Sequence, residues 1–370
     1  MTLQSRRDFL SGAGALLAAG SIPLSACSGD EGKAYESAVA ETWRPGPAQI
    51  PAAPELAELV RLATLAASSH NTQPWRFALR GREIAIVPDR SRRCPVVDPE
   101  DAHLYRSLGC AAENLVHAAP AQGLAAAPRY DPSSDAVIVS LEPAPSAKAS
   151  DLSAAIAKRQ CTRNRYDGKP VPTDALARLE RAASGAAVRG VIITDRPTID
   201  KVTELVAEGN RRQFGDPRFM AELADWIRFD DAQALATRDG LIGRASGNPP
   251  VPPWLGKLFL RFAFSAEKQN EKDVSNLASS AGVIVFAAEV DDKAAWVEAG
   301  RCYERFALTA TALGMRNAFV NQPIEVRELK PQLESLVKGA GKAQLVARFG
   351  YGPEMPRSLR RPVAAVLAPS

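Results

Sequence analysis

Apolar positions follow two different periods along this chain, which predicts a protein of mixed helices and strands. Residues 56–66, 102–122 and 294–313 carry apolar side chains at helical spacing, as do shorter stretches at 152–157 and 176–182. Short apolar runs between turn residues predict buried strands at 77–79, 84–87, 136–139, 190–193, 282–286 and 344–349. The pattern therefore predicts an α+β fold.

Composition shifts predict how the chain is divided. Residues 28–54, rich in Gly, Ala, Pro and acidic groups, are expected to form a tether before the first helix. A Pro/Ala/Ser linker then separates a first half, 55–145, from a second half, 151–370. Between 205 and 275 the pattern is first helical and then rich in Gly and Pro, which predicts a lid-like insertion or a disordered excursion.

The two halves repeat one another without a gap along one helix. Gly109 precedes Gly123 by fourteen residues, and Gly300 precedes Gly314 by the same interval. In this register Glu113 corresponds to Glu304, and the preceding helices, 59–66 and 176–183, also match. The repeat predicts two copies of one α/β unit that share a core around a pseudo-twofold axis, like a dimer fused into a single chain.

The first residues have the features of an export signal. Residues 5–10 (SRRDFL) resemble the twin-arginine signal, and the apolar run that follows is too short to span a bilayer. Residues 24–27 (LSAC) resemble a lipobox, which predicts cleavage before Cys27 and lipidation of its thiol. A plain signal peptide with an incidental cysteine is the alternative. We expect a signal over 1–27, engagement of the twin-arginine export machinery, and a lipid-anchored protein in the periplasm or cell envelope.

Charge and cysteine usage exclude other classes of function. The net charge of +4 is small for 370 residues, and the Arg clusters lack the interleaved aromatic residues of a nucleic-acid surface, so we expect no nucleic-acid partner. The cysteines after Cys27 form no CxxC pair and there are only three histidines, so we expect no metal site. A disulfide stays possible in an oxidising compartment, but free buried thiols fit the scattered spacing better.

A polar stretch, residues 67–75 (ASSHNTQPW), lies between a predicted helix and a predicted strand. Pro74 disfavours the helical conformation for Gln73, so the helix must end before it. Asn71 and Gln73 each offer donors and an acceptor, which suits the polar edge of a heteroaromatic ring. The structural alternative is a helix end with Trp75 as a core anchor, and His70 is expected to pack there rather than to donate protons.

This stretch resembles the helix-end motif of FMN-dependent nitroreductases. Residues 159–163 (RQCTR) resemble the Arg-containing arm of the same proteins. Together with residues 321–325 (NQPIE) and 360–363 (RRPV), the motifs resemble the Acg family of nitroreductase-like flavoproteins most closely. The resemblance covers roughly residues 55–370. It departs from the usual pattern at Ala67, where Pro is typical, and at Cys161, where Ser or Thr is typical.

The resemblance implies an FMN site built from both halves. From the first half, four residues are expected to contact the flavin ring: Ser68, Ser69, Asn71 and Gln73. From the second half, three residues are expected to approach the ring: Pro323, Ile324 and Glu325. The phosphate and ribityl end would be held by the basic arm and the C-terminal arginines, namely Arg159, Cys161, Arg163 and Arg360 or Arg361.

Each half lacks one part of this site. No arginine arm of this kind precedes Glu55, and the second half has only residues 183–187 (ASGAA) where its Ser/Asn loop would stand. One complementary pair of half-sites is therefore kept, which predicts one FMN per chain and a monomeric pseudo-dimer.

Two functions from different classes follow from the resemblance. The first is an oxidoreductase that passes electrons from a small-molecule donor to a small nitroaromatic or quinone-type acceptor. The second is a flavin-binding or flavin-sequestering protein with little turnover, in which the 205–275 insertion closes over the ring. Nicotinamide cofactors are scarce outside the cytoplasm, so a quinol or a redox protein is an alternative donor for an exported chain.

Overall fold

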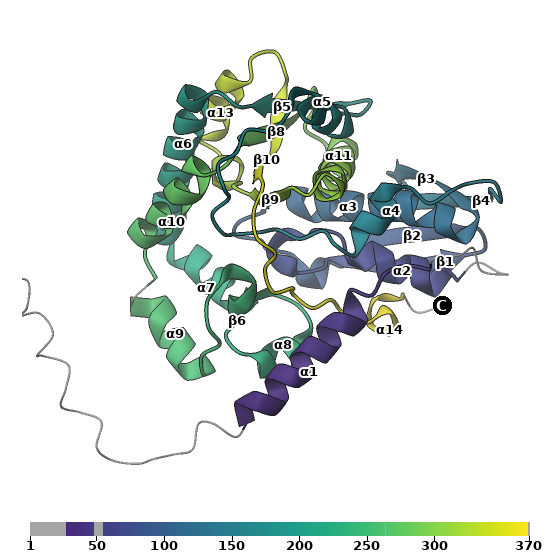
Figure 1. Ribbon diagram of the computed structural model, residues 1–370, viewed down its shortest axis with the longest axis horizontal. Helices are drawn as coiled ribbons and strands as arrows, with labels where there is room; N and C mark the ends of the chain where they lie inside the picture. The colour runs from purple at the N-terminus through teal and green to yellow at the C-terminus, as the bar shows by residue number, and fades with distance from the viewer. Residues whose placement is uncertain (1–26, 48–54, 263, 369–370) are drawn as a thin grey trace, which may run out of the picture.

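The computed structural model describes residues 27–47, 55–262 and 264–368, and contains two four-stranded antiparallel sheets (Figure 1). Of the signal predicted over residues 1–27, residues 1–26 lie outside the described residues. The first sheet has the order β1-β2-β4-β3, with strands β1 (Trp75–Arg80), β2 (Glu83–Pro88), β3 (Leu124–Asp131) and β4 (Ala136–Pro143). The second has the order β5-β8-β10-β9, with strands β5 (Val188–Ile193), β8 (Gly282–Ala288), β9 (Arg316–Phe319) and β10 (Lys342–Gly350).

The two sheets have the same topology, which confirms the internal repeat. When β1, β2, β3 and β4 are matched in chain order with β5, β8, β9 and β10, the spatial orders become identical. Helix α2 (Leu56–Thr64) precedes the first strand of one unit, and α5 (Thr173–Ala182) precedes the first strand of the other. The fold is therefore α+β and consists of two degenerate copies in one chain.

The long helices α3 (Ala102–Ala118) and α11 (Lys293–Ala312) pack against each other at the centre of the molecule. They approach most closely at the two glycines of the repeat. A Cβ atom on Gly109 would lie 2.0 Å from the Val297 carbonyl oxygen, and one on Gly300 would lie 1.9 Å from the Arg106 carbonyl oxygen. Gly123 and Gly314 both adopt positive φ just beyond these helices, as helix-ending glycines commonly do.

Helix α4 (Asp151–Ile156) connects the halves and packs against both central helices. The main core between the sheets and the central helices includes Trp75, Phe77, Phe286 and Phe306, all fully buried. Trp75 is thus a core residue, as expected. Smaller helices complete the second half and the C-terminus: α12 (Gln322–Glu325), α13 (Lys330–Leu336) and α14 (Val363–Val366).

The insertion lies where the first half has only the tight turn between β1 and β2. Between β5 and β8 the chain instead forms a series of helices and two short paired strands. This inserted segment is longer than the predicted 205–275. Its elements are α6 (Arg196–Gly215), α7 (Pro217–Trp226), β6 (Ile227–Arg228), α8 (Asp231–Thr237), β7 (Leu241–Ile242), α9 (Pro253–Phe262) and α10 (Ala266–Ala278). The insertion is therefore largely helical rather than an irregular excursion.

The prediction of a tether over 28–54 is wrong for its described N-terminal part. Residues 27–42 form helix α1 (Cys27–Thr42), which packs against α8. Tyr35 is fully buried and its hydroxyl donates a hydrogen bond to the Arg357 carbonyl, while the Trp43 indole donates to the Ser358 carbonyl. Aromatic side chains spaced along a helix supply enough apolar area to fix it to the domain. Residues 48–54 of the predicted tether lie outside the described residues.

No helix in the described part of the chain is long and apolar enough to cross a membrane. Within the same residues, no group of His, Cys, Asp or Glu is arranged to hold a metal ion. The four cysteines after Cys27 are present as free thiols, and three of them are buried: Cys94, Cys110 and Cys302.

Candidate functional site

The polar stretch after α2 forms a strained loop that starts the site. His70, Asn71 and Gln73 all have positive φ, near 50°, a region in which residues other than glycine are uncommon. Each such residue costs about 1 kcal/mol or more, so the loop needs compensating contacts. The Ser68 hydroxyl accepts a hydrogen bond from the Gln73 backbone N–H at 3.1 Å, which closes the loop on itself.

Asn71 and Gln73 supply the remaining compensating contacts. The Asn71 side-chain amide donates to the carbonyls of Gly240 and Leu359, and the Gln73 amide donates to the Arg238 carbonyl at 2.9 Å. The fully buried Gln73 also accepts from the Arg361 backbone N–H at 2.8 Å. These residues hold the loop between the insertion and the C-terminal segment. Neither lines the cavity described next, so their predicted contacts with a flavin ring stay predictions.

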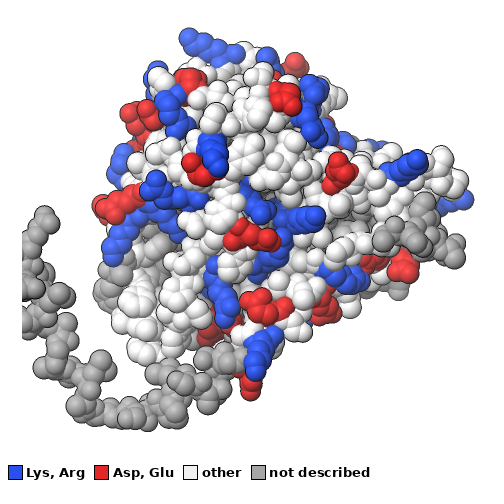
Figure 2. Space-filling model, in the orientation of Figure 1, with Lys and Arg blue, Asp and Glu red and all other residues white. Residues whose placement is uncertain are grey.

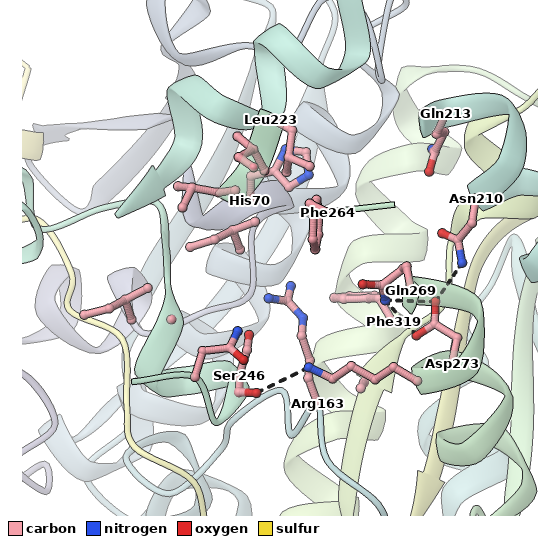
Figure 3. Close-up of a pocket in the computed structure, with 18 of the residues that line it drawn as sticks. His70, Arg163, Asn210, Gln213, Leu223, Ser246, Phe264, Gln269, Asp273 and Phe319 are labelled. Atoms are coloured by element: carbon pink, nitrogen blue, oxygen red, sulfur yellow. Dashed lines mark hydrogen bonds between the residues drawn. The ribbon is translucent and has the colours of Figure 1, made fainter. Parts of the chain in front are cut away.

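The loop opens onto a cavity of about 590 Å³ between the two halves and under the insertion (Figure 3). The first half contributes Ser68, Ser69 and His70, and the core of the second half contributes Arg163, Phe319, Glu325 and Arg348. The insertion supplies most of the rest, including Asn210, Gln213, Phe214, Phe219, Leu223, Phe259, Phe264 and Lys272. This volume falls within the range of about 300–1,000 Å³ that is usual for small-molecule sites.

Arg163 contributes a positive charge to the cavity. Figure 3 shows its side chain projecting into the open centre, and it makes no hydrogen bond or ion pair with any residue that the structure describes. Lys272 faces the same space, and its ammonium donates only to the Ser246 carbonyl, at 3.3 Å. Burial and then the nearby Arg163 lower the pKa of Lys272. Two cations that face one another across a partly buried space form a site for an anion.

Among the described residues, Glu325 is one of two acidic residues that line the cavity; the other, Asp273, accepts hydrogen bonds from the side chains of Asn210 and Gln269. Burial is the largest cause that raises the pKa of this carboxyl to about 7, and a hydrogen bond from the Gln213 side chain at 2.7 Å opposes the shift. His103 Nε2 lies 3.6 Å from the carboxylate, but burial holds the pKa of that imidazole well below its usual range. The cavity therefore contains a carboxyl group that can be protonated or ionised near neutral pH.

His70 is neutral at physiological pH. Burial, and secondarily Arg163, lowers the pKa of its imidazole to about 4. Its Nδ1 atom lies 3.6 Å from the Cys94 sulfur. An imidazole with so low a pKa is a weak proton donor at pH 7, in agreement with the expectation that it packs at the helix end.

The remaining residues of the predicted arm are used inside the protein. Arg159 is buried, forms a 2.8 Å ion pair with Glu304 and donates to the Leu65 carbonyl at 2.7 Å. Cys161 lies 3.5 Å from the Tyr303 hydroxyl. Of the arm 159–163, only Arg163 lines the cavity. The contacts predicted between Arg159 or Cys161 and a flavin stay predictions.

The C-terminal arginines also contact protein groups. Arg360 is buried, lies over the Trp43 ring and donates to the Thr64 carbonyl at the end of α2. Burial, and then Arg159, lowers its pKa to about 9. Arg361 donates to the Ala365 carbonyl at 2.8 Å. Pro323 and Ile324 are buried and do not line the cavity, whereas Glu325 does, as do Asn321 and Gln322 of the same segment. The structure thus brings Ser68, Ser69, Arg163 and Glu325 together.

In the first half, the counterpart of Glu304 is paired with arginines of α11. Glu113, the counterpart of Glu304, is buried and pairs with Arg305 at 2.6 Å and Arg301 at 3.0 Å. Burial opposes the shift, but a hydrogen bond from His117, followed by these two arginines, lowers the pKa of Glu113 to about 2. Arg305 also donates to the Ser184 carbonyl, in the shortened loop. Arginines of α11 therefore neutralise the carboxylate where the first half lacks an arm.

Sequence reasoning missed the contributions of the insertion and of β10. Lys272, Arg348 and Phe319 line the cavity but belong to no recognised motif. Lys272 lies in helix α10 and Phe319 in strand β9, far apart in the sequence. Only the packing of α10 against the second sheet brings them together. The acid-free composition of residues 240–266 was the available signal that this segment differs from an ordinary solvated loop.

No family model matches the chain. Its sequence is similar to that of two Mycobacterium tuberculosis proteins from different strains, each named "Putative NAD(P)H nitroreductase". Each is 27% identical over 337 residues, which is 87% of this chain and 94% of the relative. The chain is therefore nitroreductase-like along most of its length, as the motifs predict.

Solved structures of nitroreductases with bound FMN match parts of the chain. The protein from Desulfitobacterium hafniense gives a TM-score of 0.37 at 11% identity, over 58% of this chain and 95% of its own. The protein from Bacteroides fragilis gives a TM-score of 0.35 at 15% identity, over 57% of this chain and 95% of its own.

Proposed function

We propose that the protein is an FMN-binding, nitroreductase-like oxidoreductase with one flavin per chain, bound in the cavity between its halves. The observation that carries the proposal is Arg163, a cation directed into an aromatic cavity without a partner among the described residues. Similarity to proteins named as NAD(P)H nitroreductases supports the same assignment. When bound, FMN would supply the redox chemistry, and the protein would bind and orient it.

The residues of the cavity fit a ligand that is flat at one end and anionic at the other. Arg163 and Lys272 would hold the phosphate, as charge-assisted donors favour such oxygens. Phe319 offers an aromatic face and is itself stacked on Tyr303, with the ring centroids 4.2 Å apart. Ser68 and Ser69 would present hydroxyl groups from the other half to the polar edge of the ring.

Electrons would pass from a small donor to a small acceptor of the nitroaromatic or quinone type. Glu325, with a pKa of about 7, is the cavity group best suited to exchange a proton with bound substrate. NADPH, NADH and a quinol are the donors to compare.

One structural feature favours a second candidate function, flavin binding with little turnover. Helices α7 and α9 of the insertion contribute Phe219, Leu223 and Phe259 to the cavity wall, so the insertion covers the site. A lid that stays closed would exclude substrates, as the resemblance to the Acg family implies. Anaerobic bleaching of the bound flavin distinguishes the two functions. Bleaching by NADPH, NADH or a quinol supports the oxidoreductase, whereas bleaching by dithionite alone supports sequestration.

FMN titration of an Arg163→Met variant tests the binding site. Loss of a charge-assisted contact worth about 1.5–3 kcal/mol should raise the Kd for FMN by roughly ten- to a hundredfold. Arg165→Met is the matched control, because Arg165 is exposed and does not line the cavity. An unchanged Kd in the Arg163→Met protein would contradict the assignment of this site. A measured ratio near two FMN per chain would exclude the single-site arrangement.

We also propose that the chain is exported by the twin-arginine route and anchored through a lipid on Cys27. The supporting features are the SRRDFL sequence and the LSAC sequence at the appropriate spacing. Mass analysis of the membrane-extracted protein should find a lipid-modified Cys27 at the mature N-terminus. Recovery of the unmodified full-length chain from the cytoplasm would contradict this proposal.

A further inference from the structure

The outer face of helix α9 is the main concentration of exposed apolar side chains in the described part of the molecule. Seven large hydrophobic residues in the described part of the chain are substantially exposed, and four of them lie between positions 254 and 264: Trp254, Leu258, and the cavity-lining Phe259 and Phe264. Trp254 is the most exposed, at 69%. Clustering of this kind marks an interaction surface, whereas single exposed apolar residues are ordinary.

The charge of this segment is also distinctive. Residues 240–266 contain three basic residues and no acidic residue, in a chain with 42 acidic residues. Figure 2 shows few charged side chains on the visible surface over α9. Lys257 is exposed between Trp254 and Leu258. Aromatic and aliphatic residues combined with Lys or Arg, on a helix of this kind, are typical of elements that lie in the interface of an anionic membrane.

The position of α9 relative to the N-terminus fits the same partner. Helix α1 begins at Cys27 and packs against α8, and Gly32 of α1 lies close to Arg244. The loop before α8 in turn contacts α9, because Phe229 packs directly over Gly256. The start of α1 and helix α9 lie toward the same end of the molecule in Figure 1. A chain that leaves the start of α1 toward a membrane would thus bring α9 near the lipid surface.

We propose that helix α9 is a membrane-docking element whose outer face, Trp254 and Leu258, inserts into the interfacial region of an anionic bilayer. Helix α9 adds a contact with the bilayer to the lipid proposed on Cys27, and fixes the orientation of the protein. Its inner face, with Gly256 and Leu260, lines the cavity, so docking places the cavity next to the lipid. This inference concerns the surface alone and does not depend on the flavin chemistry.

Fluorescence quenching by brominated lipids tests the insertion directly. The full-length protein is mixed with vesicles of phosphatidylethanolamine and phosphatidylglycerol in which part of the lipid carries brominated acyl chains. Of the five tryptophans, three are buried and Trp226 is half-buried, so Trp254 should be the one quenched. We expect quenching in the wild-type protein and its loss in Trp254→Phe, a substitution that keeps an aromatic group. Equal quenching in the two proteins would overturn the proposal.

Vesicle sedimentation measures the contribution of the whole face. All proteins carry Cys27→Ala and are full length, so residues 1–26 contribute equally to binding. We expect Trp254→Glu/Leu258→Glu to bind at least about tenfold more weakly, because two apolar side chains can no longer be buried in lipid. Leu79→Glu and Val290→Glu, at exposed apolar positions on other elements, are the controls and should bind as the parent does. Parent-like binding by the double variant would overturn the proposal. Vesicle-independent dimerisation that the same double variant abolishes would also overturn it, and would assign the face to self-association.

Discussion

The Glu325→Gln variant should make the protein more stable than the wild type at high pH but not at low pH. Burial raises the pKa of this carboxyl from 4.5 in the unfolded chain to about 7 in the folded protein. Because the folded pKa is the higher one, the favourable contribution of Glu325 is complete below pH 4.5 and is lost as the pH rises through 7. Glutamine keeps an acceptor for the Gln213 amide but cannot ionise.

The structure sets the size of this effect. At about 1.4 kcal/mol per pKa unit, the shift from 4.5 to about 7 corresponds to roughly 3 kcal/mol. The side chain retains 17% exposure to solvent, which makes this value an upper bound. The difference in unfolding free energy between Glu325→Gln and the wild type should therefore rise from near zero at pH 4.5 to about 2–3 kcal/mol at pH 8.

Urea denaturation across this pH range measures the difference. Comparing two proteins that differ at one residue cancels the titration of all the other groups, including Glu113, whose pKa is shifted in the opposite direction. Glu328→Gln is the control, because Glu328 is largely exposed and should give a difference that does not vary with pH. A constant difference for Glu325→Gln across the range would refute the reasoning that the buried carboxyl titrates near neutrality.

Three further predictions concern the scaffold. Gly109→Ala should lower the unfolding free energy by about 3 kcal/mol or more, since its Cβ would clash with backbone, whereas Gly215→Ala should change it little in the same denaturation assay. Arg159→Met should destabilise by about 3–5 kcal/mol, because Glu304 would be left buried without its partner; adding Glu304→Gln should restore part of the loss, and a merely additive double variant would contradict the pairing. Gln73→Ala should cost about 2–3 kcal/mol and weaken FMN binding by titration, because the strained loop loses its buried hydrogen bonds; full binding would show that the loop holds without them.

Much of the fold could be predicted from the sequence, because periodicity and glycine spacing directly reflect local structure. The glycine spacing predicted the repeat and the packing of its central helices, and the structure places Gly109 and Gly300 at the contact between α3 and α11. Strand β3 was not predicted, since its Ala-rich sequence with Pro128 is a poor strand former. It is tolerated because β3 lies at the edge of its sheet, where Pro disrupts no ladder. Helix α1 was read as a tether because its composition is polar, although Tyr35 and Trp43 fix it to the domain.

The site was predictable only in part. Ser68, Ser69, Arg163 and Glu325 were identified from motifs and all line the cavity. Lys272 was missed because its role arises from a helix of the insertion packing near the motif residues. Sequence spacing also could not show that Arg159 has a buried carboxylate beside it, since Glu304 lies in a helix that begins more than a hundred residues later.

Glu113 and its counterpart Glu304 pair with arginines from different segments of the chain. This difference shows what the joining of two copies in one chain makes possible. In a dimer of identical chains, one substitution alters both interfacial sites at once, so neither can be abandoned while the other is preserved. Here Arg301 and Arg305 pair with Glu113 of the first half, whereas Arg163 of the second half is directed into the cavity. Covalent joining thus released each copy from the requirement to serve both roles. One copy was therefore free to replace a binding position with ion pairs that stabilise the fold.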